Sequence, residues 1–229
     1  MCSLHNIIKY GKLFSSLEDV SCYLEFASES DAEQWGDRNY ADWGTKYKRT
    51  MRIAKEIGRS TVTYPFATIE QYCGYDFRQI NSYLRGCCDE TLSDVYREMS
   101  HILTILISDA PPIPNDIVVY RLVCDAFADH LYKQNKSGTV AIEAGFMSTS
   151  LLNRITEQDE PYAQHKNLLK IYVPKGTPGV YVNTVAKRSE QEILIAPNRF
   201  LTMVKYPYKG NDDKTIIECR LLNMECALL

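Results

Sequence analysis

The sequence lacks the spaced cysteine and histidine pairs that hold zinc, although it is not short of cysteine. Eight of its 229 residues are cysteines, yet no C-x-x-C pair occurs and the closest two, Cys87 and Cys88, are adjacent. The four histidines form no motif. We therefore expect no metal site, and we interpret the scattered cysteines as reduced thiols rather than a disulfide set.

Three further absences narrow the function. The net charge of −3 is not the basic surplus that general nucleic-acid binding requires. No apolar run approaches the roughly 20 residues that cross a bilayer, so we expect no membrane insertion. The fingerprint G-x-G-x-x-G is also missing, which argues against a Rossmann-type dehydrogenase.

What is present is an ordinary globular composition, 45% hydrophobic and 24% charged, which changes character near residue 112. Before that point, apolar periodicity predicts helices over 31–59, 65–75, 76–87 and 89–108. Ser30 or Asp31 is expected to cap the first helix, and Gly36 and Gly44 predict that it is broken rather than one rod.

After residue 112, short β-like runs are separated by Gly, Pro, Asn and Asp. They cover 117–123, 144–150, 167–174, 179–183, 191–197, 200–208 and 214–222, with a helix over 124–134. Helices followed by strands predict an α+β fold. We expect one domain over 1–229, with a helical part at about 1–112 and a β core at about 113–229.

Two carboxylates, Glu190 and Glu192, stand two apart where the apolar run Ile193–Ile195 begins. On an extended segment such residues point to one face, where like charges repel each other. One interpretation is a solvated strand edge. The other is a pair of carboxylates with separate catalytic tasks, as in glycosidic chemistry.

Two other features accompany this pair in the strand region. Arg121 stands near the end of the run V-V-Y-R, and an arginine fork suits a pyrophosphate as well as a neighbouring carboxylate. The run G-F-M-S-T-S ends in three hydroxyl residues, Ser148, Thr149 and Ser150.

In this order, the three features resemble the arginine–serine–glutamate class of mono-ADP-ribosyltransferases, which contains the clostridial actin-modifying and C3-like bacterial toxins. The segments 32–43, 67–86, 171–182 and 192–198 are also similar to that family, so the resemblance runs from about residue 30 to the C-terminus. It implies NAD as co-substrate, without a metal, and a fold of N-terminal helices followed by two packed, mainly antiparallel β-sheets.

The resemblance also implies roles for the residues. Glu192 binds the ribose and stabilises the positive charge that develops when nicotinamide leaves, Glu190 orients or deprotonates the acceptor, and Ser148 fixes Glu192. Arg121 holds the NAD phosphates. The remaining expected NAD contacts come from Asn81, Arg85 and Tyr72 in the helical part, with Tyr72 either covering the adenine or only packing between helices, and from Thr149 and Ser150.

The sequence departs from the family pattern after Ser-Thr-Ser. The expected aromatic there is Tyr162, but no arginine follows it, so Arg154 or Lys166 is left to contact a phosphate. Leu122 stands where actin-modifying members carry a second arginine. The basic loop before Glu190 lacks the aromatic with which many members grip their target, so we expect a target other than actin or Rho-type GTPases.

Glu190 favours arginine as the acceptor, by family correlation, with threonine as the other possibility. Alternatives to the transferase are an NAD glycohydrolase, and a non-catalytic binding module of the same fold. We expect a monomer whose partner is a host protein. The first twenty residues lack a standard secretory signal, so we expect a bacterial effector, secreted or injected by other machinery, that acts in the host cytosol.

Overall fold

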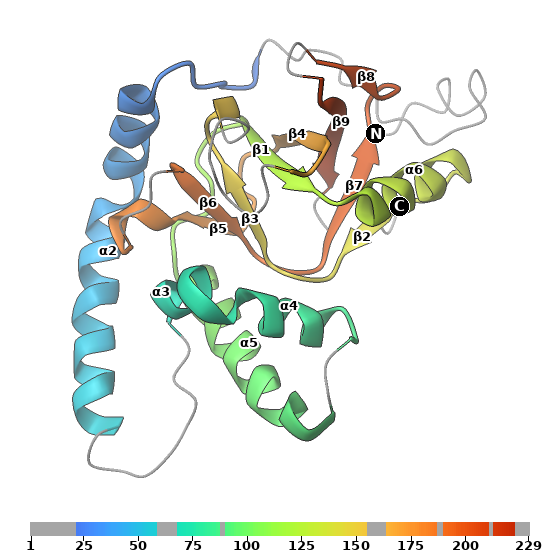
Figure 1. Cartoon of the computed structure of the whole chain (residues 1–229). Coiled ribbons are helices and arrows are strands. Elements are labelled where there is room, and N and C mark those ends of the chain that lie inside the picture. The colour runs from blue at the N-terminus through green and yellow to red at the C-terminus, as the bar shows by residue number, and fades with distance from the viewer. Residues whose placement is uncertain are drawn as a thin grey trace.

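The computed structural model describes residues 22–58, 68–87, 90–154, 164–186, 190–210 and 213–222 (Figure 1). Its helices are α2 (Glu29–Gly58), α3 (Ile69–Gln71), the π-helix η2 (Tyr72–Asp76), α4 (Phe77–Leu84), η3 (Glu90–Leu92), α5 (Ser93–Ser108), α6 (Asp125–Lys136) and η5 (Val182–Thr184). Its strands are β1 (Ile117–Val123), β2 (Ala141–Glu143), β3 (Met147–Ser150), β4 (Asn167–Val173), β5 (Gly179–Tyr181), β6 (Glu192–Ile195), β7 (Arg199–Met203), β8 (Tyr208–Lys209) and β9 (Thr215–Leu222). The α+β class expected from the sequence is confirmed.

The strands form one hydrogen-bonded sheet in the order β2-β7-β9-β4-β1-β3-β6-β5, with β8 beside β9. All pairs are antiparallel except β4–β9. The expected division into two separate sheets is not seen, because β3 continues the sheet from β1. That junction is narrow, since β1 and β3 share the single pair Tyr120↔Ser150. It brings Arg121 next to the Ser-Thr-Ser strand.

Strand β1 separates two apolar clusters. Ile117, Val119 and Val123 belong to the main core, while Val118, Tyr120 and Leu122 belong to a second cluster on the other face. Because side chains alternate along a strand, Arg121 points to the main-core face, toward the helical part of the molecule.

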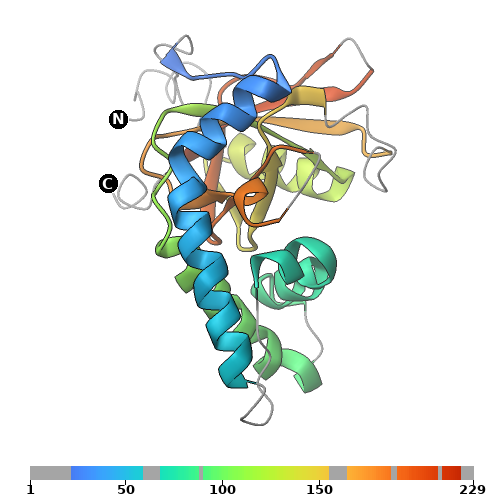
Figure 2. The same ribbon diagram turned by 90° about the vertical axis from the view of Figure 1, so that its left-hand side faces the viewer.

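Helix α2 is a single helix of 30 residues that runs down one side of the molecule (Figure 2). The predicted break at Gly36 and Gly44 is wrong. A Cβ built on Gly36 would lie 2.2 Å from the Tyr181 ring, and one on Gly44 would lie 2.9 Å from Cβ of Thr184. These glycines let the helix approach β5 and η5. The helix begins at Glu29, two residues earlier than expected, and Ser28 takes the place of the expected caps Ser30 and Asp31, with its Oγ accepting from Asp31 N at 3.2 Å.

The two short helices predicted over 65–75 and 76–87 form one helical run, α3–η2–α4, joined by a π-helical turn. Its start is a capping box between Thr68 and Gln71. Tyr47 of α2 ties this run to α2, because its hydroxyl accepts from Ile69 N at 2.9 Å and donates to Glu70 at 2.6 Å. Tyr72 and Cys73 thereby sit on the turn that faces the sheet.

Helix α5 packs beside α4, below the sheet in Figure 1. Its buried stripe is Met99, Ser100, Leu103 and Ile107. Two apolar residues near its start, Leu92 and Val95, are exposed. Within the part of the chain that the structure describes, no helix is both long and apolar enough to cross a membrane.

Candidate active site

Glu192 is the more buried of the two glutamates predicted to be catalytic. It is the first residue of β6 and is only 1% exposed. Ser148 Oγ on the neighbouring strand β3 donates to its Oε1 at 2.5 Å, and its backbone N–H donates to Asn183 Oδ1 at 3.3 Å. Cys73 Sγ lies 3.9 Å from the same Oε1. The alternative of a solvated strand edge is therefore wrong for Glu192.

The rest of the Ser-Thr-Ser triplet binds the backbone beside Glu192. Thr149 Oγ1 donates to Ile193 O at 2.8 Å, and Ser150 Oγ donates to Glu190 O at 2.6 Å. Ser150 Oγ also accepts from Leu152 N at 3.0 Å. Each hydroxyl of the triplet thus contacts the segment that carries the two glutamates.

Gln191 separates the glutamates and changes the geometry expected for them. Its φ of 49° lies in the left-handed region, and β6 begins only after it. The expected extended alternation therefore does not hold between Glu190, which is half-buried, and Glu192. Gln191 is itself buried, and its side chain accepts from the Tyr181 hydroxyl and donates to Glu29 at 3.2 Å.

A groove of about 510 Å³ opens beside Gln191. One wall is a stripe of α2 at helical spacing that carries Glu29, Glu33 and Asp37, and the other includes Asn183. Burial, followed by these three carboxylates, raises the pKa of Tyr181 above its ordinary value. The groove next to the two glutamates is therefore acidic.

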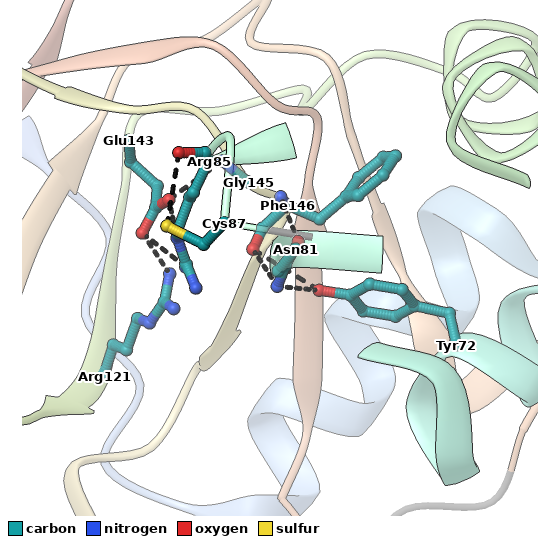
Figure 3. A network of polar contacts seen from close by, with 8 residues as sticks. All are labelled: Tyr72, Asn81, Arg85, Cys87, Arg121, Glu143, Gly145 and Phe146. Atoms are coloured by element: carbon teal, nitrogen blue, oxygen red, sulfur yellow. Dashed lines mark hydrogen bonds and ion pairs between the residues drawn. The ribbon is translucent and has the colours of Figure 1, made fainter. Parts of the chain in front are cut away.

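The two arginines expected at the phosphates, Arg85 and Arg121, meet on one buried carboxylate, Glu143 (Figure 3). Arg85 donates to it from Nε and Nη2, each at 3.0 Å, and Nη1 of Arg121 lies 3.6 Å from Oε2. Burial alone lowers the pKa of Arg85, but the hydrogen bonds and charge of Glu143 outweigh it, so that the pKa is raised. Together, the two guanidinium groups and the Glu143 carboxylate carry one net positive charge.

Asn81 fastens α4 to the loop between β2 and β3 (Figure 3). Its side chain accepts from Phe146 N at 2.8 Å and donates to Phe146 O at 3.3 Å and to the Tyr72 hydroxyl at 3.0 Å. Gly145 permits this contact, because a Cβ there would lie 2.8 Å from Asn81 Oδ1. Asn81 and Arg85, one turn apart, thus contact the same short loop.

Tyr72 is only 1% exposed, and its ring packs edge-on against Phe146 with the ring centroids 5.3 Å apart. Burial raises the pKa of its hydroxyl. This arrangement agrees with a packing role for Tyr72, which was the second of the two interpretations of this residue.

The candidates from the loop after Ser-Thr-Ser do not join the arginine cluster. Arg154 lies 3.6 Å from Glu29, with both side chains more than half exposed. Lys166 is exposed next to the start of β4, and Tyr162 lies outside the described residues. In the described ranges, no group of three or more His, Cys, Asp or Glu residues is placed to hold a metal ion.

The sequence interpretation missed Glu143, Asn183 and Gly145. A signal for Glu143 existed, because the strand Ala141–Glu143 alternates and puts this glutamate on the same face as Ala141. A carboxylate on a buried face requires cationic or hydrogen-bonding partners. For Asn183, which lies nine residues before its partner, no local pattern indicates the contact.

Comparisons with known proteins show the family and the fold of this chain. The model of the family described as ADP-ribosyltransferase exoenzyme matches residues 32–223. None of the curated proteins compared with the chain matches it in sequence.

Several solved bacterial toxins share the fold. The ADP-ribosylating toxin BECa of a C. perfringens binary enterotoxin, solved with NADH, is 21% identical to this chain, with a TM-score of 0.67. The match covers 87% of this chain and 50% of the toxin, so the chain spans half the length of that protein. The C3stau2 enzyme of S. aureus, solved with NAD, is 20% identical with a TM-score of 0.61, over 88% and 99% of the two chains. The C3 exoenzyme of Clostridium limosum is 18% identical with a TM-score of 0.59, over 88% and 98%. The chain therefore belongs to the ADP-ribosyltransferase exoenzyme family, a family of NAD-dependent enzymes.

Proposed function

We propose that this protein is a mono-ADP-ribosyltransferase that transfers ADP-ribose from NAD to a side chain of a host protein. The observation that carries the proposal is Glu192, which is 1% exposed and held by Ser148 Oγ at 2.5 Å. NAD supplies the ADP-ribosyl group and releases nicotinamide. A buried, pre-oriented carboxylate is the group that stabilises positive charge developing in such a transfer.

Two arginines and one carboxylate support an anion site beside the loop that leads into the Ser-Thr-Ser strand. Arg85 is 40% exposed at its side chain and Arg121 is 19% exposed, so both remain accessible to a ligand although they pair with Glu143. Guanidinium forks suit phosphate oxygens, and their net charge with Glu143 is positive. We assign the NAD diphosphate to this pair, and Asn81 to holding the loop beside it.

Glu190 and the acidic groove support arginine as the acceptor. Ser150 fixes the Glu190 backbone, while the half-buried position of Glu190 leaves it beside the groove lined by Glu29, Glu33 and Asp37. A cationic segment of a partner complements this field, and Glu190 is placed to orient the incoming side chain. Threonine remains the second acceptor type, since a hydroxyl also needs a base to remove its proton.

The proposed place of action is the cytosol of a host cell. Unpaired thiols suit a reducing compartment, and Cys87, Cys124 and Cys219 are such thiols within the described residues. The structurally similar proteins named above are bacterial toxins and exoenzymes.

Mass spectrometry of a eukaryotic cytosolic lysate tests the proposal directly. The lysate is incubated with NAD and either the wild type or the Glu192→Ala variant. One host protein gaining a single ADP-ribose, on arginine and with the wild type alone, is the expected result. Nicotinamide release without any modified protein would favour a glycohydrolase, and intact NAD with both proteins would favour a binding module.

A further inference from the structure

Glu143 stands at an unusual place for a carboxylate. It ends the edge strand β2, yet it is only 1% exposed, and the loop that follows it leads directly into the Ser-Thr-Ser strand β3. Burying a carboxylate costs free energy unless it is fully paired. Its partners therefore indicate what it is for.

The partners hold Glu143 in one position. Its Oε1 accepts from Arg85 Nε at 3.0 Å and from Gly145 N at 2.9 Å, and its Oε2 accepts from Arg85 Nη2 at 3.0 Å. The Gly145 N–H and the strand anchor the carboxylate, so the arginines are oriented by it rather than the reverse. A Cβ on Gly145 would come within 3.2 Å of Arg85 Nη2, which shows how closely the loop and the fork fit.

The way in which Glu143 binds leaves donors for a ligand. It occupies one edge of the Arg85 fork, formed by Nε and Nη2, and it approaches Arg121 only at Nη1, at 3.6 Å. Nη1 of Arg121 is buried and faces Glu143, so the exposed 19% of the Arg121 side chain belongs to its other atoms. One carboxylate thus brings two guanidinium groups from α4 and β1 together without saturating either (Figure 3).

We propose that Glu143 is a positioning residue that holds Arg85 and Arg121 as a preformed cradle for a diphosphate, which in the proposed function is that of NAD. Two arginine side chains without such a partner would each lose rotamer freedom when the ligand binds, and their like charges would repel. The shared carboxylate removes both costs before binding. It acts through the arginines and touches no reacting atom.

The test is the variant Glu143→Gln, measured in the full chain by the kinetics of nicotinamide release and by the affinity for ADP-ribose. We expect KM for NAD and Kd for ADP-ribose to rise together, by about tenfold to a hundredfold, with kcat within about threefold of the wild type. A purely structural role would instead lower the amount of active enzyme and leave KM unchanged.

Glu218→Gln is the matched control. Glu218 is also buried, and it accepts from Tyr172, Tyr208 and Lys205 at 2.9, 2.6 and 2.7 Å on the second-cluster side of the sheet. Its variant should lose stability without a change in KM. If Glu143→Gln does not fold at the assay temperature, Glu143→Asp, which keeps the charge on a shorter side chain, is judged by the same split between KM and kcat.

Unchanged or tighter binding of ADP-ribose by the Glu143 variants would overturn the inference, because the carboxylate would then only neutralise the arginines or compete with the ligand. A wild type that binds no ADP-ribose would overturn it as well. A wild type that binds ADP-ribose but transfers nothing would contradict the proposed function alone, and the binding measurements would still decide the role of Glu143.

Discussion

At the scale of single residues, the site joins two kinds of polar group. Glu192 and Ser148 form a short hydrogen bond at the start of β6, while Glu143 gathers the two arginines Arg85 and Arg121. The first pair was expected from the order of motifs in the sequence. Glu143 was not, because the burial of a glutamate depends on which distant side chains surround it, and neither Arg85 nor Arg121 lies near it in the chain.

Substituting Ser148 by alanine removes the hydroxyl that fixes Glu192. We expect kcat for nicotinamide release to fall by about tenfold to a hundredfold, since a misplaced catalytic group loses rate before it loses binding. KM for NAD should change little. Steady-state kinetics check this, with Ser100→Ala as the control. Ser100 Oγ is likewise a hydrogen-bond donor, but its acceptor is the backbone carbonyl of Arg97, at 2.7 Å, on α5 away from Glu192. Equal losses in both variants would contradict the role of Ser148.

At the scale of elements, most predicted helices and strands recur in the structure, but β2 was not predicted and the run predicted over 200–208 contains the end of β7 and the start of β8. Short β-like runs bounded by turn residues mark β1, β4, β6 and β9 correctly, because these signals are local. The glycines of α2 and the π-helical turn were misread. A glycine in a helical segment suggests a break when it has no packing role. Here the glycines are needed because distant residues pack against them, and the sequence does not show which residues these are.

The close approach at Gly36 predicts a large cost for a methyl group. Gly36→Ala should lower the free energy of unfolding by about 1–3 kcal/mol through overpacking against Tyr181, despite the better helix propensity of alanine. Gly74→Ala is the matched control in η2, since nothing lies within 4 Å of a Cβ built there. Urea denaturation compares the two. A Gly36 variant as stable as the wild type would show that α2 does not need this contact.

At the scale of the whole molecule, one face of the sheet is turned toward the helices. On the opposite face, Glu218 is bound by Lys205, Tyr208 and Tyr172. The continuous strand order could not be read from the sequence, because hydrogen bonding between β1 and β3 rests on a single residue pair and leaves no sequence pattern. The class and the order of elements, in contrast, follow from the succession of helical and β-like runs.

The opposite face predicts how acid affects stability. Burial raises the pKa of Glu218, but the hydrogen bonds from Lys205, Tyr208 and Tyr172 outweigh it, so that the pKa lies below its ordinary value of 4.5. A depressed carboxyl pKa contributes stability that is present above about pH 4.5 and is lost as the pH falls through the folded-state value. Denaturation midpoints of Glu218→Gln should therefore fall less between pH 5 and about pH 3 than those of the wild type. Parallel curves would contradict this.

The central claim is that the charge of Glu192 acts in the chemical step more than in the affinity for NAD. The most direct test measures, in the same preparation, the affinity for NAD and the rate of nicotinamide release for the wild type and for Glu192→Gln, which keeps the size of the side chain and removes its charge. We predict a Kd for NAD within about threefold and a loss in kcat of about a thousandfold or more. A variant that releases nicotinamide at the wild-type rate, or that loses rate only because NAD no longer binds, would contradict the account.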